Sequence, residues 1–499
     1  MTETPEEVVA RAVARARASQ AAWAALGVAE RVRRLAPLKD RLLDGAAAMA
    51  ACIHEEVGKP VVEALLGEVL PSADVVVYWT RSIEALLEPM EVPLDPLSYP
   101  SKQGTLSREP RGVVGVIMPW NFPVALPLRT IVPALLAGNA VVFKPSEVAP
   151  RSGALLAEAL SGLVPEGVFA CVQGARDVGA ALVGADVDFI VFTGGTAAGR
   201  SVARACAERL VPCALELGGK DAAIVLDDAD LERAAHGVVW GSMMNAGQNC
   251  ASIERVYVDR RVADAFQEKV SAAVRSLRFG VDVERLATRA QRERVAAQVA
   301  AATAAGAIVL AGGEGAGEGP SATADPRAYP PTVVRAEGEA AGPMREETFG
   351  PVLALAVVDG EDEAIDRANA SRYGLTASLW TRNAGRGRRL AGRLRAGVVT
   401  INNHGFTGAL PGAPWTGRGD SGWGVTGSPL ALDALTMPRF VLVDRSRARR
   451  ELWWFPYTPA LAAVASSMAV VRSSTQSLWS RGRALVALIL AMMRRSREL

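Results

Sequence analysis

Histidine, cysteine and aromatic residues are scarce in this chain of 499 residues. The three histidines, His54, His236 and His404, lie far apart, so we expect structural roles for them and no metal site. Five cysteines at irregular spacing form neither a disulfide framework nor a zinc pattern, which favours a reducing compartment. The acidic start MTETPEE lacks the features of a secretory signal, and we therefore expect an intracellular, cytoplasmic protein.

The chain also lacks an excess of charge and a long apolar run near its end. With 55 basic and 53 acidic residues its net charge is +2, which predicts no nucleic-acid partner. The apolar stretch 484–493 near the C-terminus has ten residues, too few to span a bilayer, which takes about 20. Arginines flank it on both sides. Two interpretations stay open: a helix packed on the domain or on a partner subunit, and an interfacial membrane anchor that makes peripheral contact with lipid.

What the chain does have is an alternation of short apolar runs and helical patterns. Residues 6–90 are helical in pattern, and 93–111 resembles a β-hairpin arm. Buried strands are expected at 113–117, 140–143, 189–192 and 222–226, with helices at 125–136 and 153–160 between them. The length allows two or three domains, and the alternation predicts an α/β fold with a doubly wound sheet.

One cysteine stands in a setting that suits chemistry. Cys250 ends the polar run Asn245–Asn249, where helical spacing has stopped and a strand-like run has not yet begun. Main-chain N–H groups at such a turn can stabilise a thiolate and later an oxyanion. A small buried apolar residue is the common alternative for a free cysteine, and this stretch alone does not separate the two.

Two further polar residues strengthen the chemical interpretation. Glu216 ends an apolar strand that runs into two glycines, and a carboxylate buried there would have the raised pKa of a general base. Asn121 lies in the turn of GVIMPWNFP, where its amide could donate to an oxyanion. Together with Cys250 they supply a nucleophile, a base and an oxyanion donor.

Six motifs in this order resemble the aldehyde dehydrogenase superfamily: PWNFP, GNAVVFKPSE, FTGGTAAGR, LELGGKD, GQNC and EETFGP, over roughly Arg11 to Arg439. The resemblance implies a Rossmann-type cofactor domain, an α/β catalytic domain and a β-hairpin oligomerisation arm. The expected ranges are 1–94 with 112–217 for the cofactor domain, 218–400 for the catalytic domain, 95–111 with 401–440 for the arm, and 441–499 for a C-terminal tail. It also implies NAD(P)-dependent oxidation of an aldehyde to a carboxylic acid, by a homodimer or homotetramer.

The resemblance assigns roles residue by residue. Cys250 would be the nucleophile of a thiohemiacetal and thioester, Asn121 an oxyanion donor, and Glu216 the base that activates water. An acid at Glu147 favours NAD over NADP, although NADP stays open. Cofactor-binding positions would be Lys144, Glu147, Gly194, Gly195, Thr196, Gly199, Glu347, Phe349 and Trp120.

The substrate is less well defined. Arg129 matches an arginine that meets the substrate carboxylate in succinate-semialdehyde-type relatives, but Met244 stands where they often carry a second one. Met243, Met244, Trp120 and Phe122 would instead make a mainly apolar tunnel. Trp415 lies in PWTGRGDSG, a departure from the usual PFGGxKxSG at the substrate mouth.

Two other functions stay open. One is an acylating enzyme in which coenzyme A takes the acyl group, against which Glu216 argues because a hydrolytic enzyme needs that carboxylate. The other is a catalytically idle scaffold or tail-anchored interaction protein, which would have no need of Cys250, Glu216 and Asn121 together.

Overall fold

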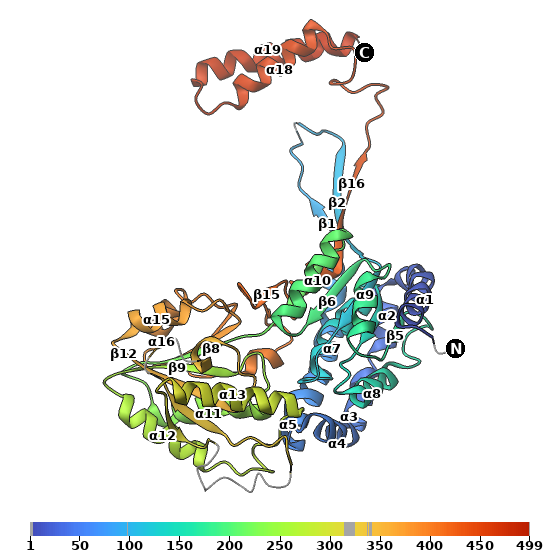
Figure 1. Ribbon diagram of the computed structural model, residues 1–499. Coiled ribbons are helices and arrows are strands. Elements are labelled where there is room, and N and C mark those ends of the chain that lie inside the picture. Colours follow the sequence, from blue (N-terminus) through green and yellow to red (C-terminus); the bar gives the residue numbers. More distant parts are fainter. Residues whose placement is uncertain (1–2, 97, 314–324, 337, 339–341, 499) are drawn as a thin grey trace. The chain divides into compact units, whose positions relative to one another are not determined.

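The computed structural model (Figure 1) describes residues 3–96, 98–313, 325–336, 338 and 342–498. The chain divides into two compact units. The first comprises residues 1–88 and 108–438, and the second comprises residues 89–107 and 439–499.

The first sheet of the larger unit has six strands in the order β15-β7-β6-β3-β4-β5. Five of them run parallel and only β15 is antiparallel, paired with β7. Short apolar runs without alternation form these strands, as buried parallel strands require. The bounds are β3 Val113–Ile117, β4 Ala140–Lys144, β5 Phe169–Cys171, β6 Phe189–Thr193, β7 Cys213–Glu216 and β15 Gly422–Trp423.

Helices accompany this sheet, as the sequence predicts. A capping box of Thr4 and Glu7 begins α1, and Gly58, with a φ of 82°, ends α4 because a left-handed residue stops the helix. The elements are α1 Pro5–Ala25, α2 Gly27–Leu35, α3 Leu38–Asp44, α4 Ala46–Val57, α5 Val61–Ala64, the π-helical turn η1 Leu65–Val69, α6 Leu70–Leu87, α7 Ala125–Leu136, α8 Pro150–Leu160, α9 Arg176–Gly184, α10 Thr196–Glu208 and α17 Ala431–Leu435.

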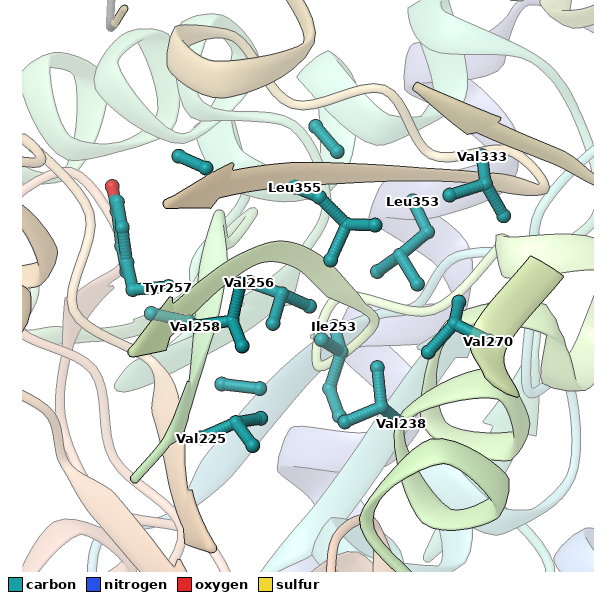
Figure 2. Packing of buried hydrophobic residues seen from close by; sticks show 14 of the residues in the cluster. Val225, Val238, Ile253, Val256, Tyr257, Val258, Val270, Val333, Leu353 and Leu355 are labelled. Carbon is teal, nitrogen blue, oxygen red and sulfur yellow. The ribbon is translucent and has the colours of Figure 1, made fainter. Parts of the chain in front are cut away.

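A second sheet has seven strands in the order β10-β11-β12-β9-β8-β13-β14, of which only β10 is antiparallel. Figure 2 shows its core, where side chains of β8, β9, β11 and β12 meet those of α11 and α12. The bounds are β8 Asp221–Val225, α11 Leu231–Met243, η2 Met244–Gly247, β9 Ile253–Asp259, α12 Ala263–Arg275, α13 Arg289–Ala304, β10 Ile308–Ala311, β11 Thr332–Arg335, α14 Gly342–Arg345, β12 Val352–Val358, α15 Glu361–Asn369, β13 Thr376–Trp380, α16 Ala384–Ala391, β14 Val398–Ile401 and η3 Phe406–Ala409.

The smaller unit contains most of a three-stranded sheet and a pair of helices. Strands β1 Met90–Val92 and β2 Lys102–Pro110 form the expected antiparallel hairpin, and β16 Thr436–Asp444 completes the order β1-β2-β16. Helices α18 Pro459–Arg472 and α19 Leu478–Glu498 pack against each other (Figure 1). Among the described residues, no helix is long and apolar enough to cross a membrane.

The α/β fold is therefore confirmed, with two mostly parallel sheets flanked by helices. The finer division into cofactor domain, catalytic domain, arm and tail stays a prediction.

Candidate active site

The carboxyl ends of neighbouring parallel strands meet at one edge of the six-stranded sheet, where open α/β sheets bind ligands. Lys144 ends β4, Thr193 ends β6, Glu216 ends β7, and the turn with Asn121 follows β3. A cavity of about 670 Å³ opens there, and Lys144, Thr193 and Asn121 are in its wall. We refer to it as the cofactor cavity.

A second cavity, of about 820 Å³, has a mainly apolar wall, and we refer to it as the aldehyde cavity. Cys250 belongs to the walls of both cavities, so the two spaces meet at its side chain. The wall of the aldehyde cavity includes Leu66, Phe122, Leu126, Arg129, Trp240, Met243, Met244, Leu277 and Trp415. Phe122, Met244, Arg129 and Trp415 thus lie together, as the sequence predicts for the substrate site.

Cys250 follows a strained turn between α11 and β9. Asn245 and Ala246 have φ values of 54° and 53°, in the left-handed region that such residues seldom adopt, and Gly247 follows at 70°. A Cβ on Gly247 would lie 2.0 Å from the carbonyl oxygen of Gly350, so only glycine fits there. Strain held by surrounding contacts is typical of functional sites.

The surroundings of Cys250 keep its thiol neutral in the free protein. Burial is the largest cause of its raised pKa, followed by the negative charges of Glu216, Asp221 and Glu347. The turn was expected to stabilise a thiolate, but the three carboxylates and burial outweigh the one main-chain hydrogen bond that lowers the pKa, from Ala251. The thiolate must therefore form when a ligand or a base alters this balance.

Asn121 is 2% exposed and faces the same cavity as Cys250. Its Nδ2 donates to the carbonyl oxygen of Gln248 at 3.1 Å, which fixes the amide next to the nucleophile turn. An amide nitrogen carries two N–H donors, so this bond leaves one for an oxyanion in the cavity. Its Oδ1 is buried with no hydrogen-bond partner among the described residues.

Glu216 is buried at the end of β7. Its carboxylate accepts hydrogen bonds from the hydroxyls of Thr426 and, at 3.5 Å, Thr193. Burial raises its pKa, and the charge of Arg129 and the two hydroxyls lower it. The same carboxylate raises the pKa of Cys250, which places the two groups within electrostatic reach of each other.

The cofactor cavity has features that fit a dinucleotide. Lys144 donates to Glu147 at 3.2 Å, so an ammonium and a half-exposed carboxylate stand together where a ribose could bind both. Gly194 and Gly195 precede α10, whose N-terminus favours a phosphate. A Cβ on Gly199 would lie 2.4 Å from Leu217, so this glycine serves close packing of helix on strand.

Other predicted cofactor residues complete the cavity wall or support it. Trp120 and Phe349 both line it, with their rings edge to face at 5.6 Å. Trp120 therefore does not line the apolar tunnel, and that part of the tunnel prediction is wrong. Glu347 accepts from the N–H of Gly219 at 3.0 Å, and burial raises its pKa to about 7. Thr196 donates to the carbonyl of Asp420 at 3.2 Å, away from the described cavity wall.

Arg129 is 5% exposed, lines the aldehyde cavity and is within electrostatic reach of Glu216. Burial lowers its pKa, while the charges of Glu216 and Cys250 raise it. Its guanidinium carbon is 5.4 Å from the ring centre of Trp415, and its Nη2 has no hydrogen-bond partner among the described residues. The group can hold the Glu216 carboxylate electrostatically, and it can also accept an anion.

Sequence reasoning missed a set of buried residues that support the site. Lys59 donates to Glu68 and to the carbonyl of Asn121, and Glu63 accepts from the N–H of Asn245 at 2.8 Å. Gly58-Lys59-Pro60 reads in the sequence only as a helix break, although a lysine and two glutamates on an apolar helical stretch are a signal of buried pairing. Thr426, which binds Glu216, has no comparable signal.

Among the described residues, no group of three or more histidine, cysteine, aspartate or glutamate side chains could hold a metal ion. The buried His404 instead contacts the carbonyl oxygen of Ala251 through Nε2 at 2.6 Å, and burial lowers its pKa to about 4. This neutral ring packs behind the nucleophile turn.

Comparison with known proteins identifies the family. The model of the "Aldehyde dehydrogenase family" matches residues 1–441. A "4,4'-diapolycopene aldehyde oxidase" from Methylomonas sp is 37% identical over 441 residues, which cover 87% of this chain and 82% of that protein. A "Putative succinate-semialdehyde dehydrogenase [NADP(+)] 2" from Mycobacterium tuberculosis (strain H37Rv) is 35% identical over 448 residues, covering 88% and 84%. The structure of PnpE in complex with nicotinamide adenine dinucleotide superposes with a TM-score of 0.83 at 34% identity, covering 88% of this chain and 90% of that one. The structure of PnpE from Pseudomonas sp. WBC-3 has the same TM-score and identity and covers 89% and 91%.

Proposed function

Because this chain belongs to the aldehyde dehydrogenase family and oxidises aldehydes with NAD or NADP, we propose that its substrate is a long, apolar aldehyde. The observation that carries this proposal is the aldehyde cavity. It has a volume of about 820 Å³, its wall is mainly apolar, and Cys250 is part of that wall. Cavities of roughly 300–1,000 Å³ enclose ligands of drug size, so this one exceeds the needs of an aldehyde of a few carbons.

Cys250 is the proposed nucleophile. Its sulfur attacks the aldehyde carbon and forms a thiohemiacetal, and loss of hydride from that carbon leaves a thioester. Water then attacks the thioester carbon, the carbon–sulfur bond breaks, and the carboxylic acid leaves. NAD(P), when bound, supplies the hydride acceptor, and its cationic ring also favours the thiolate.

Asn121 is the proposed oxyanion donor. Its amide is fixed by the Gln248 carbonyl, so the second N–H can point into the cavity without paying for reorganisation during the reaction. In the thiohemiacetal the former aldehyde oxygen carries the developing charge, and a donor held in advance stabilises it by roughly 3 kcal/mol.

Glu216 is the proposed base for hydrolysis. The raised pKa of Glu216 suits proton abstraction from water. Arg129, Thr426 and Thr193 lower that pKa and so limit how far burial raises it. In the structure the carboxylate is hydrogen-bonded to the two threonines, so it has to rotate toward Cys250 for the hydrolytic step. A carboxylate at this position favours water over coenzyme A as the acyl acceptor.

The cofactor would be held by Lys144 and Glu147 at one ribose, by the glycines before α10 at the pyrophosphate, and by Glu347 and Phe349 near the ring. Glu147 argues for NAD as the preferred form because its carboxylate would repel a 2′-phosphate. We also propose assembly into a homodimer or homotetramer. Strand β16 supports it, because this edge strand exposes Phe440, Val441, Leu442 and Val443.

A short anionic aldehyde is the second candidate, and Arg129 is the observation that favours it. Arg129 lines the aldehyde cavity, its buried Nη2 has no hydrogen-bond partner among the described residues, and the Mycobacterium tuberculosis relative carries the name of a succinate-semialdehyde enzyme. Against it, Met244 leaves half of a carboxylate clamp missing, and Arg129 already faces the charge of Glu216.

The test is the rate of NADH or NADPH formation with acetaldehyde, octanal, hexadecanal, benzaldehyde and succinic semialdehyde. We expect kcat/KM to rise with chain length, by at most about fourfold per buried methylene. Leu66→Glu places a charge in the wall of the cavity and should depress the rates with octanal and hexadecanal only. Leu210→Glu is the matched control, since Leu210 is 91% exposed and lies elsewhere. A preference for succinic semialdehyde would support the second candidate instead.

A further inference from the structure

The last 61 residues differ in charge from the rest of the chain. Residues 439–499 contain eleven arginines, no lysine and three acidic residues, a net charge of +8. Since the whole chain carries +2, the other 438 residues carry −6. A near-neutral total therefore conceals a strongly basic segment, and four of its arginines, Arg445, Arg447, Arg449 and Arg450, are exposed just before the helices.

Helices α18 and α19 with the preceding residues 452–457 form what we call the C-terminal hairpin (Figure 1). Its helices bury little: within α18 and α19 only Val464, Ala491 and Arg495 have buried side chains among the described residues. Arg495 donates to the carbonyl oxygens of Leu452, at 2.9 Å, and of Trp454. This contact fixes the aromatic segment against the end of α19.

One side of α19 is a continuous exposed apolar face. Positions spaced seven, eleven and fourteen residues apart share a helix face, and two such rows run side by side here. Their exposure ranges from 37% to 84%, far above what a packed helix shows. The rows are Leu478, Leu485, Ile489 and Met492, and Trp479, Val486, Leu490 and Met493.

Arginines border this face on both sides. By helical spacing Arg481 lies at one edge, and Arg483 and Arg494 lie at the other. Near the C-terminal end of the face stand the exposed rings of Trp453, Trp454, Phe455 and Tyr457, which the Arg495 contacts hold in place. An apolar face bordered by basic residues and tryptophan is the pattern of a helix that lies in a membrane interface.

We propose that the C-terminal hairpin docks on the surface of anionic lipid bilayers, with the apolar face of α19 among the acyl chains and the arginines at the lipid phosphates. Two copies of this face would bring Arg481, Arg483 and Arg494 of one against those of the other, which disfavours a second copy of the C-terminal hairpin as the occupant. Nucleic acid would leave the aliphatic face in water. The proposed contact is peripheral, and among the described residues no helix is long and apolar enough to cross a membrane.

Docking would also bring the enzyme to its substrate, because a long apolar aldehyde dissolves in lipid. This consequence rests on the proposed substrate class, whereas the docking itself does not. Binding to vesicles needs neither cofactor nor turnover, so it can be tested apart from the chemistry.

The experiment is flotation of the purified full-length protein with vesicles of phosphatidylcholine and phosphatidylglycerol in equal parts, compared with vesicles of phosphatidylcholine alone. We expect at least about tenfold stronger binding to the anionic vesicles, weakened by high salt because salt screens exposed charges. The double variant Ile489→Glu/Leu490→Glu should bind the anionic vesicles at least about tenfold more weakly than the parent. The triple variant Arg481→Gln/Arg483→Gln/Arg494→Gln should do the same. The matched control Ser474→Glu/Gln476→Glu adds the same charge in the exposed loop between the helices and should bind nearly as the parent does.

Acetaldehyde oxidation by each variant reports whether the catalytic unit is folded, and we expect it to be unchanged. Failure of the parent protein to float with anionic vesicles would overturn the proposal, as would equal binding by the Ile489→Glu/Leu490→Glu variant. Dissociation of an oligomer by that variant, without any lipid binding by the parent, would show that a second copy covers the face. If the parent protein bound vesicles but oxidised none of the aldehydes, that result would contradict only the proposed function.

Discussion

Lys59 and Asn121 are joined by a hydrogen bond of 2.9 Å from the lysine Nζ to the main-chain carbonyl oxygen of the asparagine. The same ammonium is paired with Glu68, whose other oxygen accepts from the N–H groups of Val124 and Ala125 at the start of α7. A buried ion pair thus holds both ends of the turn that carries the proposed oxyanion donor. The position of Asn121, and with it the proposed role of its amide, therefore depends on Lys59, which is not one of the reacting groups.

Lys59→Met should therefore reduce both stability and turnover. Leaving Glu68 as a buried, unpaired charge costs about 3–5 kcal/mol, and the freed turn lets Asn121 drift from its place. Thermal unfolding and kcat measured on the same preparation check this. Lys39→Met is the control and should change neither quantity, because this partly exposed lysine is ion-paired with its exposed neighbour Asp40 on the surface.

Asn121→Ala should lower kcat by about 10²–10³-fold with little change in cofactor affinity, because it removes a donor that acts on charge formed during the reaction. Lys59→Met retains the Asn121 amide, so its kcat should fall less than that of Asn121→Ala. If Asn121→Ala turned over at the parental rate, another group would have to hold the oxyanion.

Thr426→Val should shift the pH dependence of turnover. The hydroxyl stabilises the charged form of Glu216 and so lowers its pKa. Its removal raises the pKa further, and since a base must be deprotonated, the acid limb of the kcat profile should move to higher pH. Thr436→Val removes another buried hydroxyl, which donates to the carbonyl of Leu432, and should leave the profile in place.

Glu63 gives a prediction about stability. Burial raises its pKa from 4.5 to about 7, so the folded protein binds more protons than the unfolded chain between these values. Stability should then fall as pH rises from about 4.5 to about 7, by at most about 3 kcal/mol from this group. Glu63→Gln can still accept from Asn245 and should be more stable than the parent at pH 8, with no difference near pH 4. Equal pH dependence of the two proteins in chemical unfolding would contradict the assignment.

The sequence was informative where a local rule decides the structure. Strand 113–117 and helix 125–136 match β3 and α7 at both ends because apolar runs between glycines and prolines leave few alternatives. The partners of Glu216 could not be predicted, since Thr426 lies 210 positions away and only the folded sheet brings it close. The strain at Asn245 and Ala246 was equally hidden, because neither residue type signals a left-handed backbone strongly enough.

The tail shows a different limit. The helix expected around 484–493 is present as α19, but periodicity alone did not show that its apolar residues would be exposed. Charge counted over the whole chain also obscured the basic end. The intracellular location stays a prediction.

The most direct test of the proposed mechanism and substrate is the intact mass of Glu216→Gln after incubation with NAD and an equimolar mixture of hexadecanal and succinic semialdehyde. Without its base the enzyme should form the thioester and hydrolyse it slowly, so an acyl group should accumulate on Cys250. We expect a long-chain acyl adduct that is absent from Cys250→Ala, together with a burst of NADH. A succinyl adduct would contradict the proposed substrate, and no adduct with either aldehyde would contradict the roles given to Glu216 and Cys250.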